Sequence, residues 1–267
     1  MPAHDIDYRL IGDDLQIVEI ELDPDESVRA EAGAMLYMDA GVTMDTGTGG
    51  GFMRGLKRAF AGESFFITSF TNTGAGKARV AFSAPYPGKV VAVDLAAEGG
   101  QFLFQKDAFL CAAAGIEIEV AFTKKMGAGL FGGEGFILQR LTGDGLAFAH
   151  AGGTIIERTL SAGEVLFVDT GCLVGMAESV DYDIQFQGGF KNALFGGEGL
   201  FLTRLEGPGR VYLQSLPFSR LADRIVAASR MYSRQDQSSP LGGLGGVIGG
   251  VAGAGLLGGL LGGGNNG

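Results

Sequence analysis

The sequence contains few of the side chains on which catalytic and metal sites depend. Its 267 residues include no tryptophan, two cysteines and two histidines, His4 and His150. A Ser-His-Asp or Cys-His catalytic arrangement would have to use one of these imidazoles, and we interpret His150 as a strand-end residue instead. HExxH, paired CxxC and P-loop motifs do not occur either. We therefore predict a protein that is not an enzyme and has no cofactor.

Basic residues are also scarce. The chain has 20 lysines and arginines against 30 aspartates and glutamates, which gives a formal net charge of −10. An acidic chain disfavours binding to phosphate backbones, so we expect no nucleic-acid partner. Several cations near the glycine-rich segments fit either a solvated rim or a contact with an anionic surface. They are Arg54, Lys57, Arg58, Lys124, Lys125 and Lys191.

The N-terminus and the cysteines both bear on the cellular compartment. Residues 1–5 lack the basic and then apolar pattern of a signal peptide, which predicts a cytoplasmic protein. Cys111 and Cys172 lie in apolar stretches, which are typical of reduced core cysteines. A disulfide between them stays open, because their spacing does not decide the question.

Glycine and phenylalanine are abundant instead, with 48 and 19 residues, and both recur in a motif that is repeated three times. Each copy reads Phe-x-Gly-Glu, then one residue, then an apolar residue. The motif residues are Phe60, Gly62, Glu63, Phe131, Gly133, Glu134, Phe195, Gly197 and Glu198. Each copy leads into two strand-like runs separated by a glycine turn, which is a hairpin pattern. Self-similarity of this kind predicts a repeated supersecondary unit.

A second half-unit recurs between these motifs. Leu22 is followed nine residues later by Glu31-Ala32-Gly33-Ala34-Met35. Leu160 is followed at the same interval by Asp169-Thr170-Gly171-Cys172-Leu173, and a looser copy ends in residues 106–110. The sequence therefore alternates between two kinds of half-unit.

The two ends of the repeat region are unaccompanied halves. The chain begins with a second half, residues 8–46, and its folded part ends with a first half, residues 195–216. We infer that these halves pair and close a ring, because closure removes two exposed sheet edges. The prediction is an all-β domain over residues 1–216, with double-stranded β-helix or β-sandwich units in an internal pseudo-threefold repeat.

The C-terminal region differs in character from the repeats. Residues 217–232 have the spacing of one amphipathic helix, with Leu221 and Ile225 on one face and Arg220 and Arg224 on a basic side. Residues 233–267 read as a polar linker and then a glycine-rich low-complexity tail without charge. The tail is long enough to span a bilayer, but its glycines make it a poor helix in water. Disordered, self-associating and membrane-inserted tails all remain open.

The repeated glutamates are the most tempting candidates for a site. Three carboxylates around an axis could hold a cation. A glutamate flanked by glycines can also accept backbone N–H groups and fix a tight loop, and we favour this structural interpretation of Glu63, Glu134 and Glu198.

With the repeats laid out, the chain resembles a family of uncharacterised bacterial and archaeal proteins. That family is related to the fungal altered-inheritance-of-mitochondria (mitochondrial biogenesis) protein. The resemblance covers about residues 1–220, and it is carried by residues 31–35, 60–64 and 86–88 and by the two later FGGEG copies. It implies a double-stranded β-helix fold similar to that of the tryptophan RNA-binding attenuator protein, with internal duplication. In the mitochondrial relatives it implies a role in inner-membrane organisation, and it implies no catalytic residue.

Repetition without a catalytic constellation favours a non-enzymatic structural or scaffold protein, with membrane-associated organisation as one version of that role. We expect a homo-oligomer or a protein partner, and a peripheral membrane contact through residues 217–267 stays open. The alternative is a small-ligand or metal-binding protein, or an enzyme. It would use the interiors of the β-units or the set of Glu63, Glu134 and Glu198.

Overall fold

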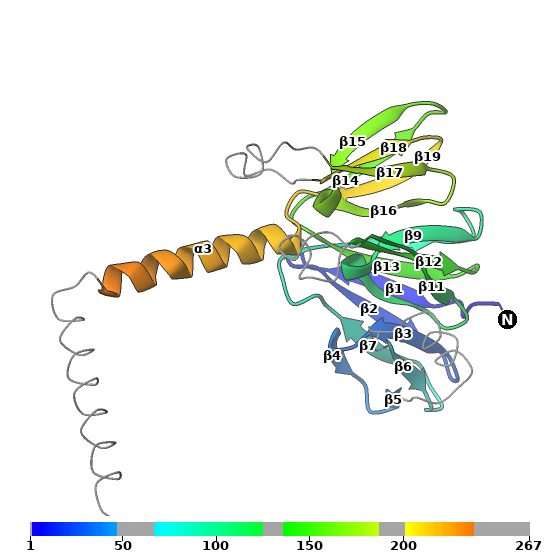
Figure 1. Cartoon of the computed structure of the whole chain (residues 1–267). Helices are drawn as coiled ribbons and strands as arrows, with labels where there is room; N and C mark the ends of the chain where they lie inside the picture. The colour runs from blue at the N-terminus through cyan, green and yellow to red at the C-terminus, as the bar shows by residue number, and fades with distance from the viewer. Residues whose placement is uncertain (1, 47–66, 125–135, 187–200, 238–267) are drawn as a thin grey trace, which may run out of the picture. The chain divides into compact units, whose positions relative to one another are not determined.

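The computed structural model describes residues 2–46, 67–124, 136–186 and 201–237. The chain divides into two units, Met1–Ser219 and Arg220–Gly267. The first unit is almost entirely β-structure, as the sequence predicts, and it contains three copies of one six-stranded pattern (Figure 1).

The strands of the three repeats follow one another in the same order along the chain. Strand β1 (Asp7–Ile11) precedes the first repeat. The first repeat comprises β2 (Ile17–Leu22), β3 (Ser27–Glu31), β4 (Met35–Met38), β5 (Val42–Asp45), β6 (Ile67–Asn72) and β7 (Ala78–Phe82). The second comprises β8 (Gly88–Asp94), β9 (Gln101–Gln105), β10 (Phe109–Ala113), β11 (Glu117–Lys124), β12 (Phe136–Thr142) and β13 (Leu146–Gly152). The third comprises β14 (Ile155–Leu160), β15 (Val165–Asp169), β16 (Leu173–Ala177), β17 (Asp181–Phe186), β18 (Phe201–Glu206) and β19 (Gly209–Gln214).

Every repeat has the same internal pairing, and every pair is antiparallel. The sixth strand pairs with the first and the third, as β7 does with β2 and β4. The fifth strand pairs with the second and the fourth, as β6 does with β3 and β5. The other two repeats repeat this scheme strand for strand. Each repeat therefore splits into two half-sheets of three strands.

Neighbouring repeats join by pairing the second strand of one with the third strand of the next. These junctions are β3 with β10 and β9 with β16. They produce two six-stranded sheets, in the orders β5-β6-β3-β10-β13-β8 and β11-β12-β9-β16-β19-β14. A four-stranded sheet, β1-β2-β7-β4, and a three-stranded sheet, β15-β18-β17, remain at the two ends of the series.

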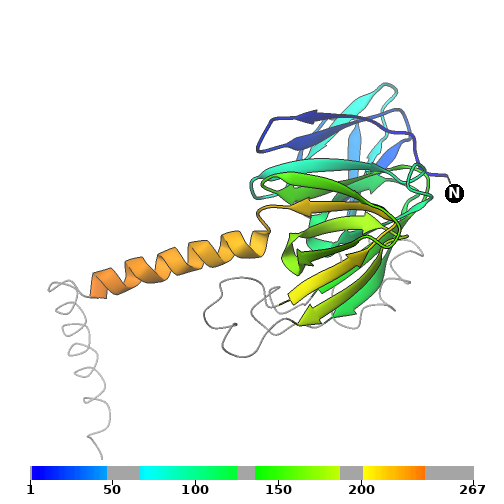
Figure 2. The ribbon, with the colours of Figure 1, turned by 90° about the horizontal axis from the view of Figure 1, so that it is seen from above.

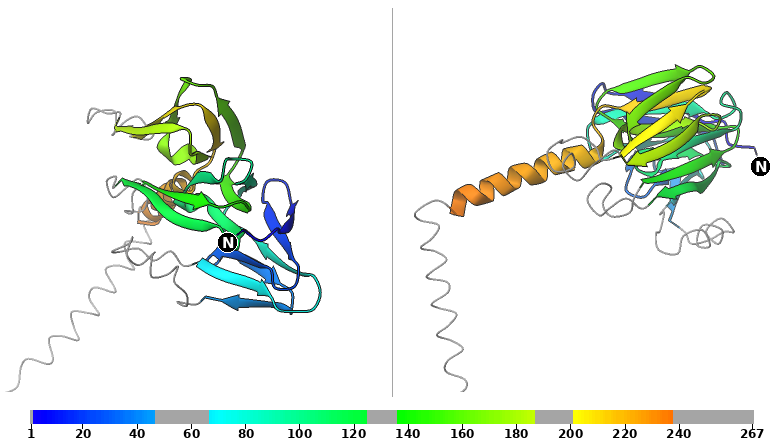
Figure 3. Two further views of the ribbon diagram at one scale, coloured as in Figure 1. Left: turned by 90° about the vertical axis from the view of Figure 1, so that its right-hand side faces the viewer. Right: turned by 45° about the horizontal axis from the view of Figure 1, so that its top comes forward.

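The described strands of the two end halves do not pair with each other as predicted. The strands of residues 8–46 pair with one another and with β6, β7 and β10, while β18 and β19 pair with β14 to β17. Among the described residues, no strand pair joins the two ends of the repeat region. Consecutive elements tend to be neighbours in space, so each Phe-x-Gly-Glu half pairs with the half before it. Figure 2 and the left view of Figure 3 show the blue N-terminal and yellow-green C-terminal strands on opposite sides of the middle repeat.

The core lies between these sheets and is rich in phenylalanine. Phe82, Phe102, Phe104, Phe136 and Phe148 are fully buried. Alternation of buried and partly exposed residues along strands such as β6 places one face of the strand in the core. Dense apolar burial of this kind is the main stabilising contribution in a fold without a disulfide bond between its two cysteines.

Two short elements and one helix complete the described structure. The 3₁₀ helices η1 (Lys106–Ala108) and η2 (Thr170–Cys172) connect the second and third strands of their repeats. Helix α3 (Phe218–Gln237) confirms the predicted helix but extends five residues beyond it. Residues 233–237 contain neither glycine nor proline, so the helix does not end where the polar linker was expected. The glycine-rich tail lies outside the described residues.

Candidate functional site

The repeated Phe-x-Gly-Glu residues cannot be assigned to a site. Phe60, Gly62, Glu63, Phe131, Gly133, Glu134, Phe195, Gly197 and Glu198 all lie outside the described residues. The same holds for most of the cations near them, apart from Lys124 at the end of β11. Within the described ranges, no group of three or more His, Cys, Asp or Glu side chains could hold a metal ion.

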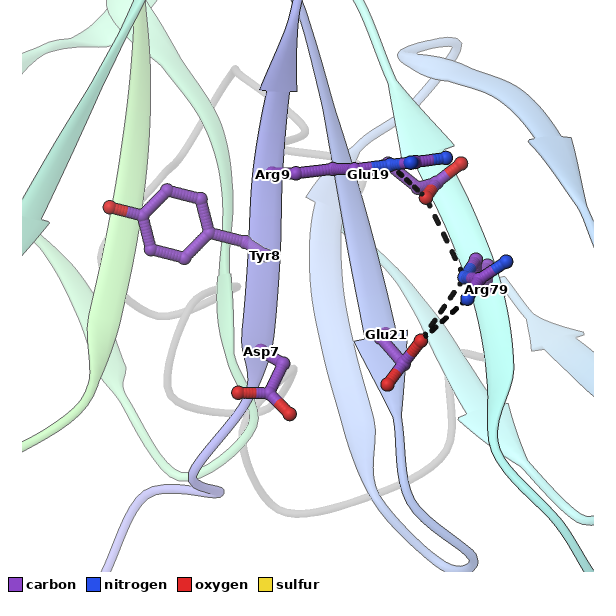
Figure 4. Close-up of a pocket in the computed structure, with 6 residues that line it drawn as sticks. All are labelled: Asp7, Tyr8, Arg9, Glu19, Glu21 and Arg79. Atoms are coloured by element: carbon purple, nitrogen blue, oxygen red, sulfur yellow. Dashed lines mark hydrogen bonds and ion pairs between the residues drawn. The ribbon is translucent and has the colours of Figure 1, made fainter.

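A charged depression of about 240 Å³ lies on β1, β2 and β7 (Figure 4). Arg9 Nε donates to Glu19 Oε1 at 2.7 Å, and Arg79 Nη2 donates to Glu21 Oε2 at 2.9 Å. Glu21 and Arg79 are direct cross-strand partners, and Lys77 Nζ reaches Glu21 Oε1 at 2.8 Å. Opposite charges at such positions stabilise a strand pair. Glu19 and Glu21 thus have cationic partners, which makes the depression a structural ion-pair ladder.

Glu19 is the most buried member of this ladder, with 5% of its side chain exposed. It accepts hydrogen bonds from Arg9 and from the Tyr37 hydroxyl group on β4. These hydrogen bonds lower the pKa of Glu19 from its usual value, with the nearby arginine charges adding to the effect. The ladder therefore connects β1 and β2 to the end strand β4.

A second titratable cluster lies around Tyr86, between the ends of β3 and β13. The Tyr86 ring meets the His150 ring edge-on at 4.6 Å, with an interplanar angle of 89°. Burial raises the pKa of Tyr86 to about 12, and the negative charges of Asp107 and Glu31 add to that shift. Burial also lowers the pKa of His150 to about 4, and its Nδ1 has no hydrogen-bond partner in the part of the chain that the structure describes.

Glu31, the last residue of β3, is a carboxylate of this cluster whose pKa is raised. Crowding by surrounding protein raises its pKa to about 7, and Asp107 raises it further while Lys106 opposes the effect. The side chain keeps contact with solvent, which screens part of this shift. The cluster can exchange protons near neutral pH, but in the described ranges it includes neither a nucleophile paired with a base nor a metal-ligand set. Sequence reasoning placed Glu31 in the second half-unit without assigning it this property.

The end strand β4 exposes four consecutive apolar side chains. Met35, Leu36, Tyr37 and Met38 are 36%, 54%, 39% and 37% exposed. The corresponding strands of the other repeats, β10 and β16, are buried at every position. Within the described residues, β4 pairs on one side only, with β7, whereas β10 and β16 each pair on both sides.

The other end strand, β15, also exposes apolar side chains. Val165 and Phe167 are 40% and 55% exposed, whereas the corresponding strands β3 and β9 lie inside six-stranded sheets. Among the described strands, β15 pairs only with β18. The uncharged run Met35-Leu36-Tyr37-Met38 could have indicated an exposed edge strand from the sequence. We did not predict this edge, because we expected the two end halves to pair with each other.

Helix α3 also carries exposed apolar side chains. Phe218, Ile225 and Val226 are 52%, 60% and 45% exposed, and Arg220 and Arg224 lie on the same helix. No helix in the described part of the chain is both long and apolar enough to span a membrane.

Comparisons with known proteins identify the family of this chain and similar proteins. The family model described as Mitochondrial biogenesis AIM24 matches residues 8–216. An uncharacterised protein of Streptococcus pyogenes serotype M6 is 32% identical over 214 residues, which cover 77% of this chain and 84% of the relative. The crystal structure of a Streptococcus pyogenes protein has a TM-score of 0.68 and 26% identity, and the match covers 84% of this chain and 99% of that chain. Since the matched range includes all three repeats, the chain belongs to the mitochondrial biogenesis AIM24 family.

Proposed function

We propose that the protein is a non-enzymatic scaffold that assembles through the edges of its two end sheets. The observation that carries the proposal is the exposure of β4 and β15, whose counterparts are interior strands elsewhere in the fold. An edge strand presents unpaired N–H and C=O groups that can pair with another strand. Natural proteins usually protect such edges with charge, whereas these two strands expose apolar side chains.

The charged ladder and the Glu31 cluster support this proposal indirectly. The ladder carboxylates Glu19 and Glu21 already have cationic partners, and the cluster combines two acidic groups with an unprotonated histidine. Neither arrangement provides the nucleophile, base and oxyanion donors that an acyl- or phosphoryl-transfer site requires. The described geometry therefore favours assembly over catalysis.

The test of the scaffold function is the native size of the protein in its own cells. Wild type and a Phe167→Glu variant would be tagged, produced at native level, and separated by gel filtration of clarified lysate. We expect wild type in a species much larger than the monomer and Phe167→Glu in a smaller one. Ile156→Glu is a matched control, because Ile156 is 46% exposed on β14, which is an outer strand in a complete six-stranded sheet. Wild type at monomer size would contradict the proposal.

A peripheral membrane contact through α3 is a second proposal, and the exposed Ile225 beside Arg220 and Arg224 supports it. Amphipathic helices with basic residues bind anionic lipid surfaces by burying their apolar face. We expect the full chain to sediment with vesicles that contain phosphatidylserine and to bind less to phosphatidylcholine alone. Ile225→Glu should reduce binding severalfold, whereas Ile156→Glu should not. Equal binding by wild type and Ile225→Glu would exclude the helix as the contact.

A further inference from the structure

We infer that the partner of each end strand is a second copy of this chain, with β15 of one copy pairing beside β4 of the next. This inference rests on the proposed scaffold function and identifies its partner. In both repeat junctions that the chain forms internally, a second strand pairs with the third strand of the following repeat. Within the described residues, the second strand of the third repeat, β15, and the third strand of the first repeat, β4, have no partner at this junction.

The two internal junctions have the same register. Ala112 lies opposite Arg29 in the first junction, and Met176 lies opposite Leu103 in the second. Ala112 and Met176 are equivalent positions, because each is the second paired residue after the bulge in the pairing with the sixth strand. In β4 that position is Met38.

The equivalent positions in the second strands β9 and β15 follow from the 3₁₀ helices η1 and η2 that come directly after them. Gln105 and Asp169 are the N-cap residues of η1 and η2. Leu103 lies two residues before the first cap, and Phe167 lies two residues before the second. The register of the internal junctions therefore places Phe167 of one copy opposite Met38 of the next, with Val168 opposite Tyr37.

Burial at the equivalent positions supports this pair. In the junction of β9 with β16, Leu103 and Met176 are 2% and 0% exposed. In the junction of β3 with β10, Ala112 is buried and the charged Arg29 is partly buried. Met38 and Phe167, the corresponding side chains at the two ends, are 37% and 55% exposed. Two large apolar side chains that face each other across an antiparallel pair contribute packing that each one lacks alone.

The distribution of charge separates β4 from the other edges of the sheets. Each strand that is outermost in a six-stranded sheet carries charged residues, as do β17 and β1 at the ends of the smaller sheets. Examples are Asp45, Lys89, Glu119, Arg158, Asp183 and Arg9. Strand β4 has no charged residue, and β15 has only its last residue, Asp169. Charge on an edge strand disfavours pairing with a foreign strand, so charge leaves β4 the edge most suited to pair, while β5 and β15 each carry one charged residue, at their last position.

Among the strands that the structure describes, pairing within one chain does not form this junction. Strands β15 and β4 lie at opposite ends of the repeat series, above and below the middle repeat in Figure 1. The pairing is head-to-tail, because the two participating strands differ. A heterologous contact of this kind produces a closed ring or an open filament, not a symmetric dimer.

The first experiment measures the mass of the purified full chain by size exclusion with light scattering. We expect wild type and Ile156→Glu to form species larger than a monomer, and Met38→Glu and Phe167→Glu to be monomers. Each single variant keeps one intact edge, so an equimolar mixture should form a 1:1 dimer and nothing larger. Circular dichroism checks that the variants fold, which we expect because both side chains are exposed. A monomeric wild type, a single variant that still assembles, or a mixture that stays monomeric would overturn the inference.

The second experiment tests the register. A Met38→Cys variant is mixed with Phe167→Cys under mild oxidation, and the disulfide-linked product is measured on a denaturing gel. The control partner is Val165→Cys, which lies on the same face two residues away. Opposite residues have Cβ atoms about 4.5–5.5 Å apart, whereas diagonal neighbours are roughly 7–8 Å apart. Cross-linking should be at least tenfold faster with Phe167→Cys, and equal rates would overturn the register.

The two proposals can fail separately. If purified wild type is monomeric while the lysate species remains large and depends on Phe167, the scaffold function stands and its partner is a different protein. If both are monomeric, the scaffold function fails as well.

Discussion

At the scale of single residues, the fold holds two titratable groups whose pKa values are shifted in opposite directions. His150 is buried beside Tyr86, and burial disfavours its cationic form. Burial by the surrounding protein, together with the negative charge of Asp107, disfavours the anionic form of Glu31. Both groups are neutral over a range in which ordinary histidine and glutamate side chains would both be charged.

The first prediction concerns His150. Its pKa is about 4 in the folded state and about 6.5 in an unfolded chain, so its contribution to stability is present above pH 6.5 and is lost as the pH falls toward 4. His150→Phe keeps a ring against Tyr86 and removes this titration. Between pH 7 and pH 4, wild type should lose about 2 kcal/mol more free energy of unfolding than the variant, as measured by urea titration. Parallel pH curves for the two proteins would show that His150 does not titrate in this way.

The second prediction concerns Glu31 and has the opposite sign. Its folded pKa of about 7 exceeds the usual value, so its contribution is present at low pH and is lost as the pH rises through 7. Glu31→Gln should therefore gain stability relative to wild type at pH 8 compared with pH 4, by about 1 kcal/mol after solvent screening. Glu117→Gln, at an exposed strand position, provides the background for the same measurement. A gain that is the same at both pH values would contradict the assigned shift.

At the scale of the elements, the junction between repeats depends on how closely its strands approach. Gly175 in β16 lies opposite Phe104 in β9. A Cβ atom at Gly175 would lie 2.6 Å from a ring atom of Phe104 and 2.7 Å from the Leu103 carbonyl oxygen. The equivalent position is Cys111 in β10, opposite Ala30, and Tyr37 in the exposed strand β4, so the glycine accompanies the bulky Phe104 on the partner strand.

The third prediction follows from this close approach. Gly175→Ala should destabilise the fold by about 1–3 kcal/mol, because the surrounding strands must shift to accommodate one methyl group. Gly76→Ala is the matched control, since a Cβ atom there would have no neighbour within 4 Å. Chemical denaturation measures both. A Gly175→Ala protein as stable as the control would mean that the junction can widen without cost.

The strands and the helix show how much of the fold could be predicted from the sequence. Alternating apolar runs and glycine turns predicted the β class, the threefold repetition and the C-terminal helix. They could not assign the pairing partners, because the first two Phe-x-Gly-Glu halves each have a second half-unit on both sides in the chain. Strands β5 and β6 pair with each other, but a long stretch separates them in the sequence, so their pairing could not be predicted from their positions in the chain. Neither the pKa of Glu31 nor the exposure of Phe167 could be predicted, because both depend on which strands become neighbours.

At the scale of the whole molecule, the exposed ends predict a stability that depends on concentration. Assembly that binds only the folded chain shifts unfolding by mass action. The midpoint of thermal unfolding of wild type should therefore rise by several degrees across a hundredfold increase in protein concentration, as measured by scanning calorimetry. Phe167→Glu should show the same midpoint at every concentration. A constant midpoint for wild type would contradict assembly of the folded chain.

The extra strand β1 gives the molecule a polarity that can be seen in images. It adds a fourth strand to the first end sheet, whereas β8 and β14, the counterparts of β2, have no such neighbour in the described structure. If three-stranded and four-stranded ends combine, each boundary between copies has a sheet one strand wider than the two sheets within a copy. Electron micrographs of an assembly would then show one broad sheet for every two narrower ones. This repeating pattern of broad and narrow sheets would give the number of subunits and their direction in the assembly without any label.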